Sequence, residues 1–296
     1  MKLTVIILNF ETSNLLNQCL KSIFKYGCKY SFQVWVVDNS SSDNSVKMVE
    51  ENHPQVVLTQ NKDNLGFAGG NNVALKKTDA EYVLLLNSDT EIFEDSLNNL
   101  VDFMDRSKFG IGSCKLVNKD GSLQPNTGDL PFGAALINWL SGIDGIFPEG
   151  IDLPSFHRNS SNFYIKEREV GWVSGTAMMI RKKVLEKIGL LDDSIFMYGE
   201  DTDYCIRAKQ AGFKIGWTDK ATVLHLGGGS LKDSKYNQWY GEFTGLLYIY
   251  KKYFGKLASF LLKILFYIFI SLRIFFLFVT GEKKVYQTYA KILFAI

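Results

Sequence analysis

The sequence predicts an α/β fold in which helices flank a mostly parallel sheet. Three observations support this class. The first 110 of the 296 residues alternate short β-branched runs with helical patterns. The runs are continuously apolar, as expected of strands that are buried on both faces. Single helices separate successive runs, which favours right-handed crossovers between parallel neighbours.

Each expected element has a local signal in the sequence. Apolar runs indicate the strands. The first helix has one apolar face, formed by Leu15, Leu16, Cys19, Leu20 and Ile23, and the polar loop 38–43 and the glycine-rich turn 64–70 precede the next two helices. Up to residue 86 we expect strands at 3–8, 34–37, 56–58 and 82–86, and helices at 13–26, 46–52 and from the glycine-rich turn 64–70 to about 77. Periodicity fades over residues 119–169, which we interpret as a partner- or substrate-facing insertion. Beyond it we expect regular structure at 170–180, helices at 182–188 and 201–210, and strands at 213–217 and 221–225.

The charge of the chain is unevenly distributed. The whole chain carries +2, but residues 251–296 contain eight basic residues against Glu282, a net charge of +7, which leaves −5 for residues 1–250. We therefore predict a catalytic domain over residues 1–250 and a basic, hydrophobic helical tail over residues 251–296. Such asymmetry indicates a membrane surface or an anionic partner for the tail, and no nucleic acid is expected.

The tail contains the most hydrophobic stretch of the chain, residues 257–279, which two charges interrupt. On a helix, one narrow stripe would hold Lys256, Ser259, Lys263 and Tyr267, with Ser271 and Arg273 beside it. The residues that would face away are Leu257, Leu261, Ile264, Leu265, Ile268 and Leu272. A charge near the bilayer centre costs about 2.5–3.5 kcal/mol, so a helix lying in the membrane interface is favoured over a spanning one. Packing of the helix on the body is the remaining alternative.

The cysteines and the first residues indicate the compartment. The four cysteines form no CxxC pair, which is typical of free thiols in a reducing environment. The apolar run after Lys2 is short and reads as a strand instead of a signal peptide. A cytoplasmic catalytic body is therefore expected.

Polar residues follow the predicted strands at the edge of the sheet where α/β folds bind ligands. Asp38 is a candidate to bind a ribose hydroxyl or a base N–H, although a turn or helix cap would use the same residue. The turn after Asn64 and Gly66 allows close backbone approach to a ligand. It lacks the GxGxxG and Walker patterns, so the fingerprints of a nicotinamide cofactor and of ATP are absent. The candidate donor-binding residues are Asn9, Glu11, Asp38, Asn64, Gly66, Asn87 and Ser88.

Asp89 and His225 are the candidate metal ligands. Asp89 follows a buried strand and could hold Mg²⁺ or Mn²⁺ if a diphosphate supplied further oxygens. A histidine beside a carboxylate leans toward Mn²⁺. His225 precedes a glycine-rich segment, 226–230, suited to closing over a ligand, whereas His53 and His157 are interpreted as structural.

The acidic cluster at 200–203 opens a helix and is the candidate for general base catalysis. A carboxylate there could remove the proton of an attacking hydroxyl, and the apolar residues 196–198 before it would raise its pKa. Helix capping and interaction with the helix dipole are the competing explanation, favoured for Asp203 and also considered for Glu200.

Together these residues resemble the family 2 nucleotide-sugar glycosyltransferases, in particular their rhamnosyltransferase-like branch. The similarity runs in order through about residues 3–230. The segments that carry it are 4–9, 36–43, 64–72, 84–89, 175–180 and 197–203. Because the motifs recur in the family's order, the set is more specific than any one of them.

The resemblance implies a GT-A fold, a nucleotide-diphosphate sugar donor with dTDP-rhamnose as the branch's favoured case, and a divalent metal, Mn²⁺ or Mg²⁺. It implies transfer with inversion by direct displacement. Asp201 would be the catalytic base, with Glu200 beside it on the acceptor side. Asp38 would contact the nucleoside, and Asp89 and His225 would hold the metal. Asn87 replaces the first acid of the family's DxD motif.

The resemblance also indicates the acceptor. The chain has no QxxRW motif after the base and no bundle of spanning helices, so transfer of one sugar is favoured over processive synthesis. The acceptor would be a glycan or a polyprenyl-linked saccharide in cell-surface polysaccharide biosynthesis. The enzyme would lie in the cytoplasm, peripherally associated with the inner face of the membrane.

Two other functions remain open. A non-catalytic nucleotide-sugar or glycan binding protein would keep the fold without turnover. A sugar-1-phosphate nucleotidyltransferase would need a GGxGTR-type signature near the first strand, and residues 9–12 do not supply one.

Overall fold

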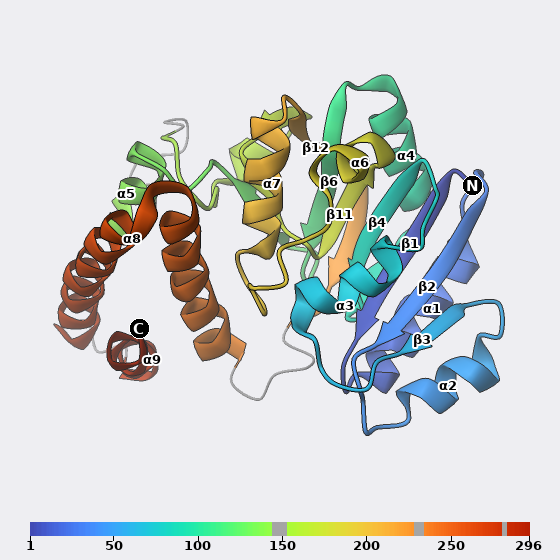
Figure 1. Ribbon diagram of the computed structural model, residues 1–296, viewed down its shortest axis with the longest axis horizontal. Coiled ribbons are helices and arrows are strands. Elements are labelled where there is room, and N and C mark those ends of the chain that lie inside the picture. The colour runs from blue at the N-terminus through green and yellow to red at the C-terminus, as the bar shows by residue number, and fades with distance from the viewer. Residues whose placement is uncertain (144–152, 228–233, 280–282) are drawn as a thin grey trace.

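The structure, a computed structural model, describes residues 1–143, 153–227, 234–279 and 283–296. Its centre is a mixed sheet in the order β3-β2-β1-β4-β11-β6-β12-β5, flanked by helices on both faces (Figure 1). The α/β class and the flanking helices predicted from the sequence are confirmed.

The first half of the sheet is parallel, as predicted. Strand β1 (Leu3–Asn9) pairs with β2 (Phe32–Asp38) and β4 (Tyr82–Asn87), and β2 pairs with β3 (Val57–Gln60). The connecting helices are α1 (Ser13–Tyr26), α2 (Ser45–Asn52) and α3 (Gly66–Leu75). Parallel neighbours have their carboxyl ends at one edge of the sheet. Asn9, Asp38 and Asn87, at the ends of β1, β2 and β4, therefore lie along the same edge.

The second half of the sheet is mixed. Strand β11 (Ala177–Arg181) runs antiparallel to both β4 and β6 (Phe109–Val117). Strand β12 (Lys214–His225) is parallel to β6 and antiparallel to β5 (Thr90–Ile92) and β9 (Arg168–Val170). The sequence predicted separate strands at 213–217 and 221–225. They form one strand, because a register shift between Thr218 and Thr222 absorbs the polar interruption without ending the pairing.

The remaining helices of the body are α4 (Ser96–Arg106), α6 (Lys182–Ile188) and α7 (Glu200–Gln210). The helix predicted at 182–188 is confirmed, and α7 begins one residue earlier than predicted. The segment 119–169 contains more structure than its weak periodicity indicated. Its short elements are β7 (Leu123–Gln124), β8 (Thr127–Gly128), α5 (Ala134–Ser141) and η2 (Ser161–Tyr164), and β8 pairs with β10 (Trp172–Val173).

Two apolar clusters occupy the two faces of the sheet. One contains side chains of α1, α2 and α4, with Leu16, Leu20 and Val101 fully buried. The other contains α3, α6 and α7, with Trp217 and Tyr204 fully buried, and continues into the C-terminal helices. This continuity means that the C-terminal helices share a core with the α/β body.

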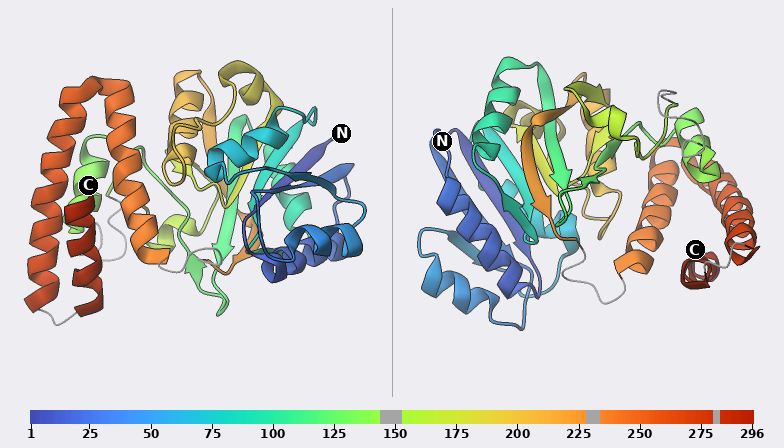
Figure 2. Two further views of the ribbon diagram at one scale, coloured as in Figure 1. Left: turned by 60° about the horizontal axis from the view of Figure 1, so that its bottom comes forward. Right: turned by 180° about the vertical axis from the view of Figure 1, so that it is seen from behind.

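The C-terminal helices form a unit beside the sheet (Figures 1 and 2). Helix α8 (Ser234–Val279) breaks at Gly255, so its second half returns alongside the first, and α9 (Lys283–Ala295) packs against α8. The predicted division between residues 250 and 251 falls inside the first half of α8. The division into a catalytic domain and a tail stays a prediction.

The second half of α8 is apolar on both its buried and its exposed sides. Leu262, Phe266 and Ile270 are buried. The residues expected to face away from the polar stripe are solvent-exposed, apart from the half-buried Leu265. Within the stripe, the Ser259 hydroxyl donates a hydrogen bond to the Leu247 carbonyl oxygen (2.9 Å). The helix therefore packs on the protein through part of its surface, which was the third alternative, and leaves a broad apolar face uncovered.

Candidate active site

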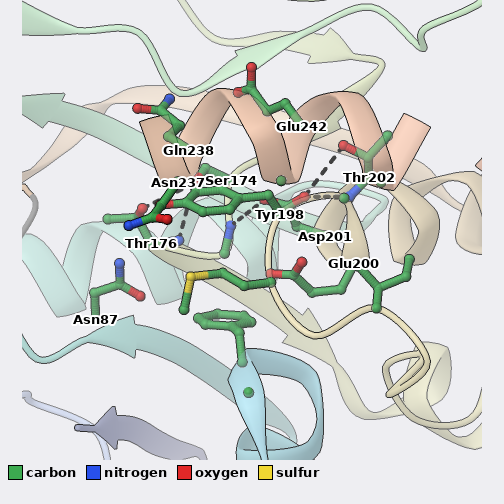
Figure 3. A pocket seen from close by; sticks show the side chains of 18 of the residues that line it. Asn87, Ser174, Thr176, Tyr198, Glu200, Asp201, Thr202, Asn237, Gln238 and Glu242 are labelled. Carbon is green, nitrogen blue, oxygen red and sulfur yellow. Dashed lines mark hydrogen bonds between the residues drawn. The ribbon is translucent and has the colours of Figure 1, made fainter. Parts of the chain in front are cut away.

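A cleft of about 960 Å³ lies at the carboxyl edge of the parallel strands. Strand ends form one wall, the loop before α7 forms another, and the first turns of α8 face them (Figure 3). Of the residues predicted from the sequence, those that line the cleft are Asn64, Gly66, Asn87, Ser88, Asp89, Glu200, Asp201 and His225.

Asn9, Glu11 and Asp38 lie behind this lining instead of in it. Asp38 is 1% exposed, and its carboxylate accepts hydrogen bonds from the Asn9 side chain (2.9 Å) and the Ser41 amide (2.8 Å). Glu11 accepts from the amide and hydroxyl of Ser42 (2.6 and 2.8 Å). These contacts order the loops at the ends of β1 and β2. A direct contact of the three residues with a donor stays a prediction.

The turn before α3 is held by a side chain that sequence reasoning missed. The Asn39 amide donates to the Asn64 side chain and to the Gly66 carbonyl oxygen (both 3.0 Å). Gly66 has φ 70°, and a Cβ there would lie 2.3 Å from the Phe196 carbonyl oxygen. Only glycine permits this approach. The amide of the next residue, Phe67, donates a hydrogen bond to that same oxygen (2.7 Å). This bond connects the turn to the loop that leads into α7 and its acidic cluster.

Asp89 and His225 meet, as the sequence predicted for a metal site. The Asp89 Oδ1 atom lies 3.2 Å from His225 Nε2, and His225 Nδ1 lies 2.6 Å from Gln124 Oε1. Two ligands of one ion with bonds of about 2.1 Å would stand about 3 Å apart at neighbouring positions, so the pair fits a divalent cation. Within the described part of the chain no third His, Cys, Asp or Glu joins them. Further ligands would have to come from the substrate, such as diphosphate oxygens.

Asp201 is the second residue of α7 and lines the cleft. Its Oδ2 accepts the Gly175 amide (3.1 Å) and its Oδ1 accepts the Thr202 amide (2.7 Å), so the carboxylate has a fixed orientation. Burial raises the pKa of Asp201, and the charge of Glu242 raises it further against these two hydrogen bonds. A fixed carboxylate of raised pKa suits a general base.

Glu200 differs from its neighbour in its surroundings. It is 4% exposed, and its Oε2 has no hydrogen-bond partner among the described residues. Burial raises the pKa of Glu200 well above its usual range, and the adjacent Asp201 charge adds to the effect. The two carboxyl groups therefore differ in character, with Asp201 the better candidate for an ionised base.

Asp203 is more than a helix cap. It is fully buried, and its carboxylate pairs with Arg207 (2.8 Å) and Lys252 (2.7 Å) and accepts the Tyr253 hydroxyl (2.8 Å). Helix capping and the helix dipole concern only the helix on which a residue lies, so they do not predict partners on another helix. The partners at 252 and 253 come from α8, almost fifty residues away.

Several residues that line the cleft were not predicted from the sequence. His157, interpreted as structural, lies in the cleft with its Nε2 3.3 Å from Glu242 Oε1. Gln238 and Asn237 join them from α8, and Tyr198 comes from the loop before α7. No motif marks residues 234–250, so only the position of α8 identifies them.

The segment 119–169 contributes Gln124, Asn126, Phe156 and His157 to the cleft. Its predicted orientation toward a substrate agrees with this placement. Residues 144–152 of the segment lie outside the described residues. So do residues 228–230 of the glycine-rich segment that was predicted to close over a ligand.

Comparison with known proteins identifies the family. Residues 4–189 match the glycosyl transferase family 2 profile, more than half of the chain. A low-salt glycan biosynthesis hexosyltransferase, Agl10 of Haloferax volcanii, is 27% identical over 75% of this chain and 66% of its own length. An N-acetylglucosaminyl-diphospho-decaprenol L-rhamnosyltransferase of Mycobacterium tuberculosis is 26% identical over 65% of this chain and 66% of its own. The chain thus spans just under two thirds of these relatives.

A solved structure shares the fold. GalNAc-T7, crystallised with UDP, GalNAc and Mn²⁺, superposes with a TM-score of 0.59 at 13% identity, over 83% of this chain and 47% of its own. Its likeness concerns the arrangement of the sheet and its helices. Fold, cleft and family match agree, and the chain belongs to glycosyl transferase family 2.

Proposed function

We propose that this protein is an inverting glycosyltransferase that moves one sugar from a nucleotide-diphosphate sugar to a hydroxyl of a glycan or lipid-linked saccharide. One observation carries the proposal. A single cleft holds the Asp89–His225 pair, suited to a divalent cation, and the oriented carboxylate of Asp201, whose pKa is raised by burial. A divalent cation would stabilise the negative charge of a diphosphate leaving group, and the Asp201 carboxylate would accept the proton of an attacking hydroxyl.

In the proposed reaction Asp201 accepts the proton of the acceptor hydroxyl while that oxygen attacks the anomeric carbon. The bond between the anomeric carbon and the diphosphate oxygen breaks, and its electrons leave with the nucleoside diphosphate. One displacement inverts the anomeric configuration, and no covalent sugar–enzyme intermediate is required. Glu200 borders the base on the cleft and would contact the acceptor.

Asp89 and His225 are the residues that would hold a divalent metal, Mn²⁺ or Mg²⁺. When bound, such an ion supplies positive charge to the leaving diphosphate. Asn64, Gly66, Asn87 and Ser88 line the same cleft and would bind the rest of the donor. Asn9, Glu11 and Asp38 would order the loops that surround it, with Asp38 also the candidate for the nucleoside.

The relatives support a role in polysaccharide or glycan biosynthesis. Their names specify a hexosyltransferase and a rhamnosyltransferase that acts on a decaprenyl-diphosphate-linked sugar. We therefore propose dTDP-rhamnose as the first donor to test and a polyprenyl-linked saccharide as the acceptor class.

Membrane association is part of the same proposal. By length and composition, α8 could cross a bilayer, and only 17% of its most apolar window is buried. The exposed apolar residues of its second half include Leu257, Leu261, Ile268, Leu272, Phe275 and Phe276. The segment 251–296 that contains this face carries a net charge of +7, which suits anionic lipid. The catalytic body would then lie at the cytoplasmic surface of the membrane.

The first test is nucleotide binding. We expect one of dTDP, UDP, GDP and CDP to stabilise the protein against thermal unfolding, and Mn²⁺ to increase the effect. A ligand at one hundred times its Kd adds about 2.7 kcal/mol to the free energy of unfolding. Stabilisation by none of the four would contradict the proposed function.

The second test removes the base. We expect Asp201→Asn to lower kcat by about 10²- to 10⁴-fold, because the amide cannot accept the proton. Nucleotide-induced stabilisation should remain, since Asp201 does not hold the diphosphate in this scheme. The measurement is release of nucleoside diphosphate during sugar transfer. Wild-type activity in the variant would exclude Asp201 as the base, and inactivity of both proteins with bound nucleotide would favour a binding protein.

A further inference from the structure

The wall of the cleft opposite the strand ends has no role in the mechanism above. It is formed by the first turns of α8, where Asn237, Gln238 and Glu242 line the cleft together with Asp201 (Figure 3). Gln238 and Glu242 are four residues apart, so they lie on one face of the helix. Side chains that can form hydrogen bonds thus line the cleft from α8, an element that carries neither Asp89 nor His225.

Glu242 stands opposite a histidine from the insertion. The His157 Nε2 atom lies 3.3 Å from Glu242 Oε1, yet the contact lacks hydrogen-bond geometry. Their side chains are 21% and 14% exposed. Buried polar groups are normally hydrogen-bonded. The pair therefore retains hydrogen-bonding capacity that a ligand in the cleft could use.

Aromatic rings pack around His157. The His157 ring centroid lies 4.5 Å from that of Phe156 and 5.1 Å from that of Trp172. The Trp172 indole donates to the Phe156 carbonyl oxygen (2.7 Å), which fixes its plane. Phe156 and Trp172 border the cleft but are 3% and 5% exposed, so they hold the His157 ring in place instead of offering a face to a ligand. A few polar groups fixed in an apolar setting are typical of small-ligand sites. The hydroxyl groups of a sugar match such polar groups.

We propose that Glu242, Gln238 and His157 form the subsite for the acceptor saccharide, with the attacking hydroxyl of that saccharide at Asp201. This assignment rests on the proposed function, because it specifies the acceptor half of that site. The location follows from the division of the cleft, since the metal-ligand pair and the strand ends occupy the opposite wall. Glu242 also interacts with the base, because its charge raises the pKa of Asp201.

The test measures saccharide binding separately from nucleotide binding. The probes are the methyl glycosides of rhamnose, glucose, galactose and N-acetylglucosamine. Each is titrated by saturation-transfer NMR into the full chain, saturated with the nucleoside diphosphate that stabilises it. For the glycoside that binds the wild type, we expect Glu242→Ala to weaken binding about tenfold or more, because a hydrogen bond to a charged group is lost. Gln238→Ala should weaken it by a smaller factor.

The control and the contrary results are defined by the same titrations. Glu186→Ala, on the exposed surface of α6, should leave glycoside affinity unchanged. Nucleotide affinity should be unchanged in all three variants. Wild-type glycoside affinity in Gln238→Ala and Glu242→Ala would overturn the subsite, as would nucleotide binding without any glycoside binding in the wild type. Gln238 is exposed, so its variant is informative even if Glu242→Ala fails to fold. Failure of nucleotide binding, by contrast, would concern the proposed function itself.

Discussion

Adjacent carboxyl groups at 200 and 201 have different surroundings. Glu200 is buried, and its Oε2 has no hydrogen-bond partner in the described part of the chain, whereas Asp201 accepts two backbone amides that favour its ionised form. Burial raises the pKa of both groups, but only Asp201 has hydrogen bonds from neighbouring residues to oppose that rise. Two carboxyl groups with such different surroundings can serve different roles, and we expect Asp201 to be the ionised one.

The pH dependence of activity follows from Asp201. Transfer requires its ionised form, so kcat/KM should fall as pH falls through its pKa, at a midpoint above the ordinary aspartate value of about 3.9. Because the Glu242 charge raises this pKa, Glu242→Gln should move the acidic limb to lower pH. The measurement is the pH–rate profile of both proteins, with Glu186→Gln as the control. An acidic limb that does not move in Glu242→Gln would contradict this electrostatic contact.

At the scale of elements, α8 is joined to α7, the helix that carries Asp201. Its Gly245 lies so close to the preceding loop that a Cβ would stand 2.3 Å from the Tyr198 carbonyl oxygen. Two turns further on, Lys252 pairs with Asp203 and with Asp192 (both 2.7 Å). Backbone packing and the ion pairs of Lys252 with buried Asp203 and half-buried Asp192 thus join α8 to the chain on both sides of Asp201.

Lys252→Met should destabilise the protein and reduce kcat. Loss of a hydrogen-bonded cation from buried Asp203 costs about 1–3 kcal/mol at neutral pH, because Arg207 and Tyr253 remain as partners. Burial alone would raise the pKa of Asp192, but hydrogen bonds from Lys252, the Ser194 amide and Tyr248 lower it to about 2. A lowered pKa contributes stability above the unfolded value of about 3.9, and that stability is lost as pH falls toward 2.

The stability difference between wild type and Lys252→Met should therefore shrink between pH 4 and pH 2, as measured by urea unfolding. The matched control is Lys251→Met, because Lys251 is an exposed neighbour on the same helix. A difference that is equal at pH 7 and pH 2, or a similar loss in the control, would show that the ion pairs with Lys252 do not carry the effect.

At the scale of the molecule, one helical unit combines a wall of the cleft with an uncovered apolar face. The first half of α8 lines the cleft, and the second half exposes apolar side chains. Deletion of residues 251–296 would remove Lys252 and Tyr253 from Asp203, so it would not test membrane binding alone. Substitutions on the exposed face separate the two roles.

We expect the full chain to float with liposomes that contain anionic lipid. Leu261→Glu combined with Leu272→Glu should abolish flotation, because both side chains are exposed and charge opposes burial in lipid. Nucleotide-induced stabilisation should remain, since neither residue lines the cleft. The control exchanges Phe93 and Ile165, exposed apolar residues of the body, for glutamate. Unchanged flotation of the α8 variant would exclude this face as the membrane contact.

The sequence by itself determined the α/β class, the parallel direction of the first strands and the position of the carboxylates at their ends. Those features depend on local periodicity and on the rule that parallel strands end at one edge. It also predicted Asp89, His225 and Asp201 as candidate site residues, because strand ends and helix starts are local signals, and the structure places all three in one cleft. The antiparallel β11, the continuous β12 and the contribution of α8 were decided by tertiary packing. Glu242 and His157, which face each other, are 85 residues apart in the sequence, and Lys252 and Asp203 are 49 residues apart. No local pattern encodes such contacts, since they depend on how the helices pack against the sheet and against each other.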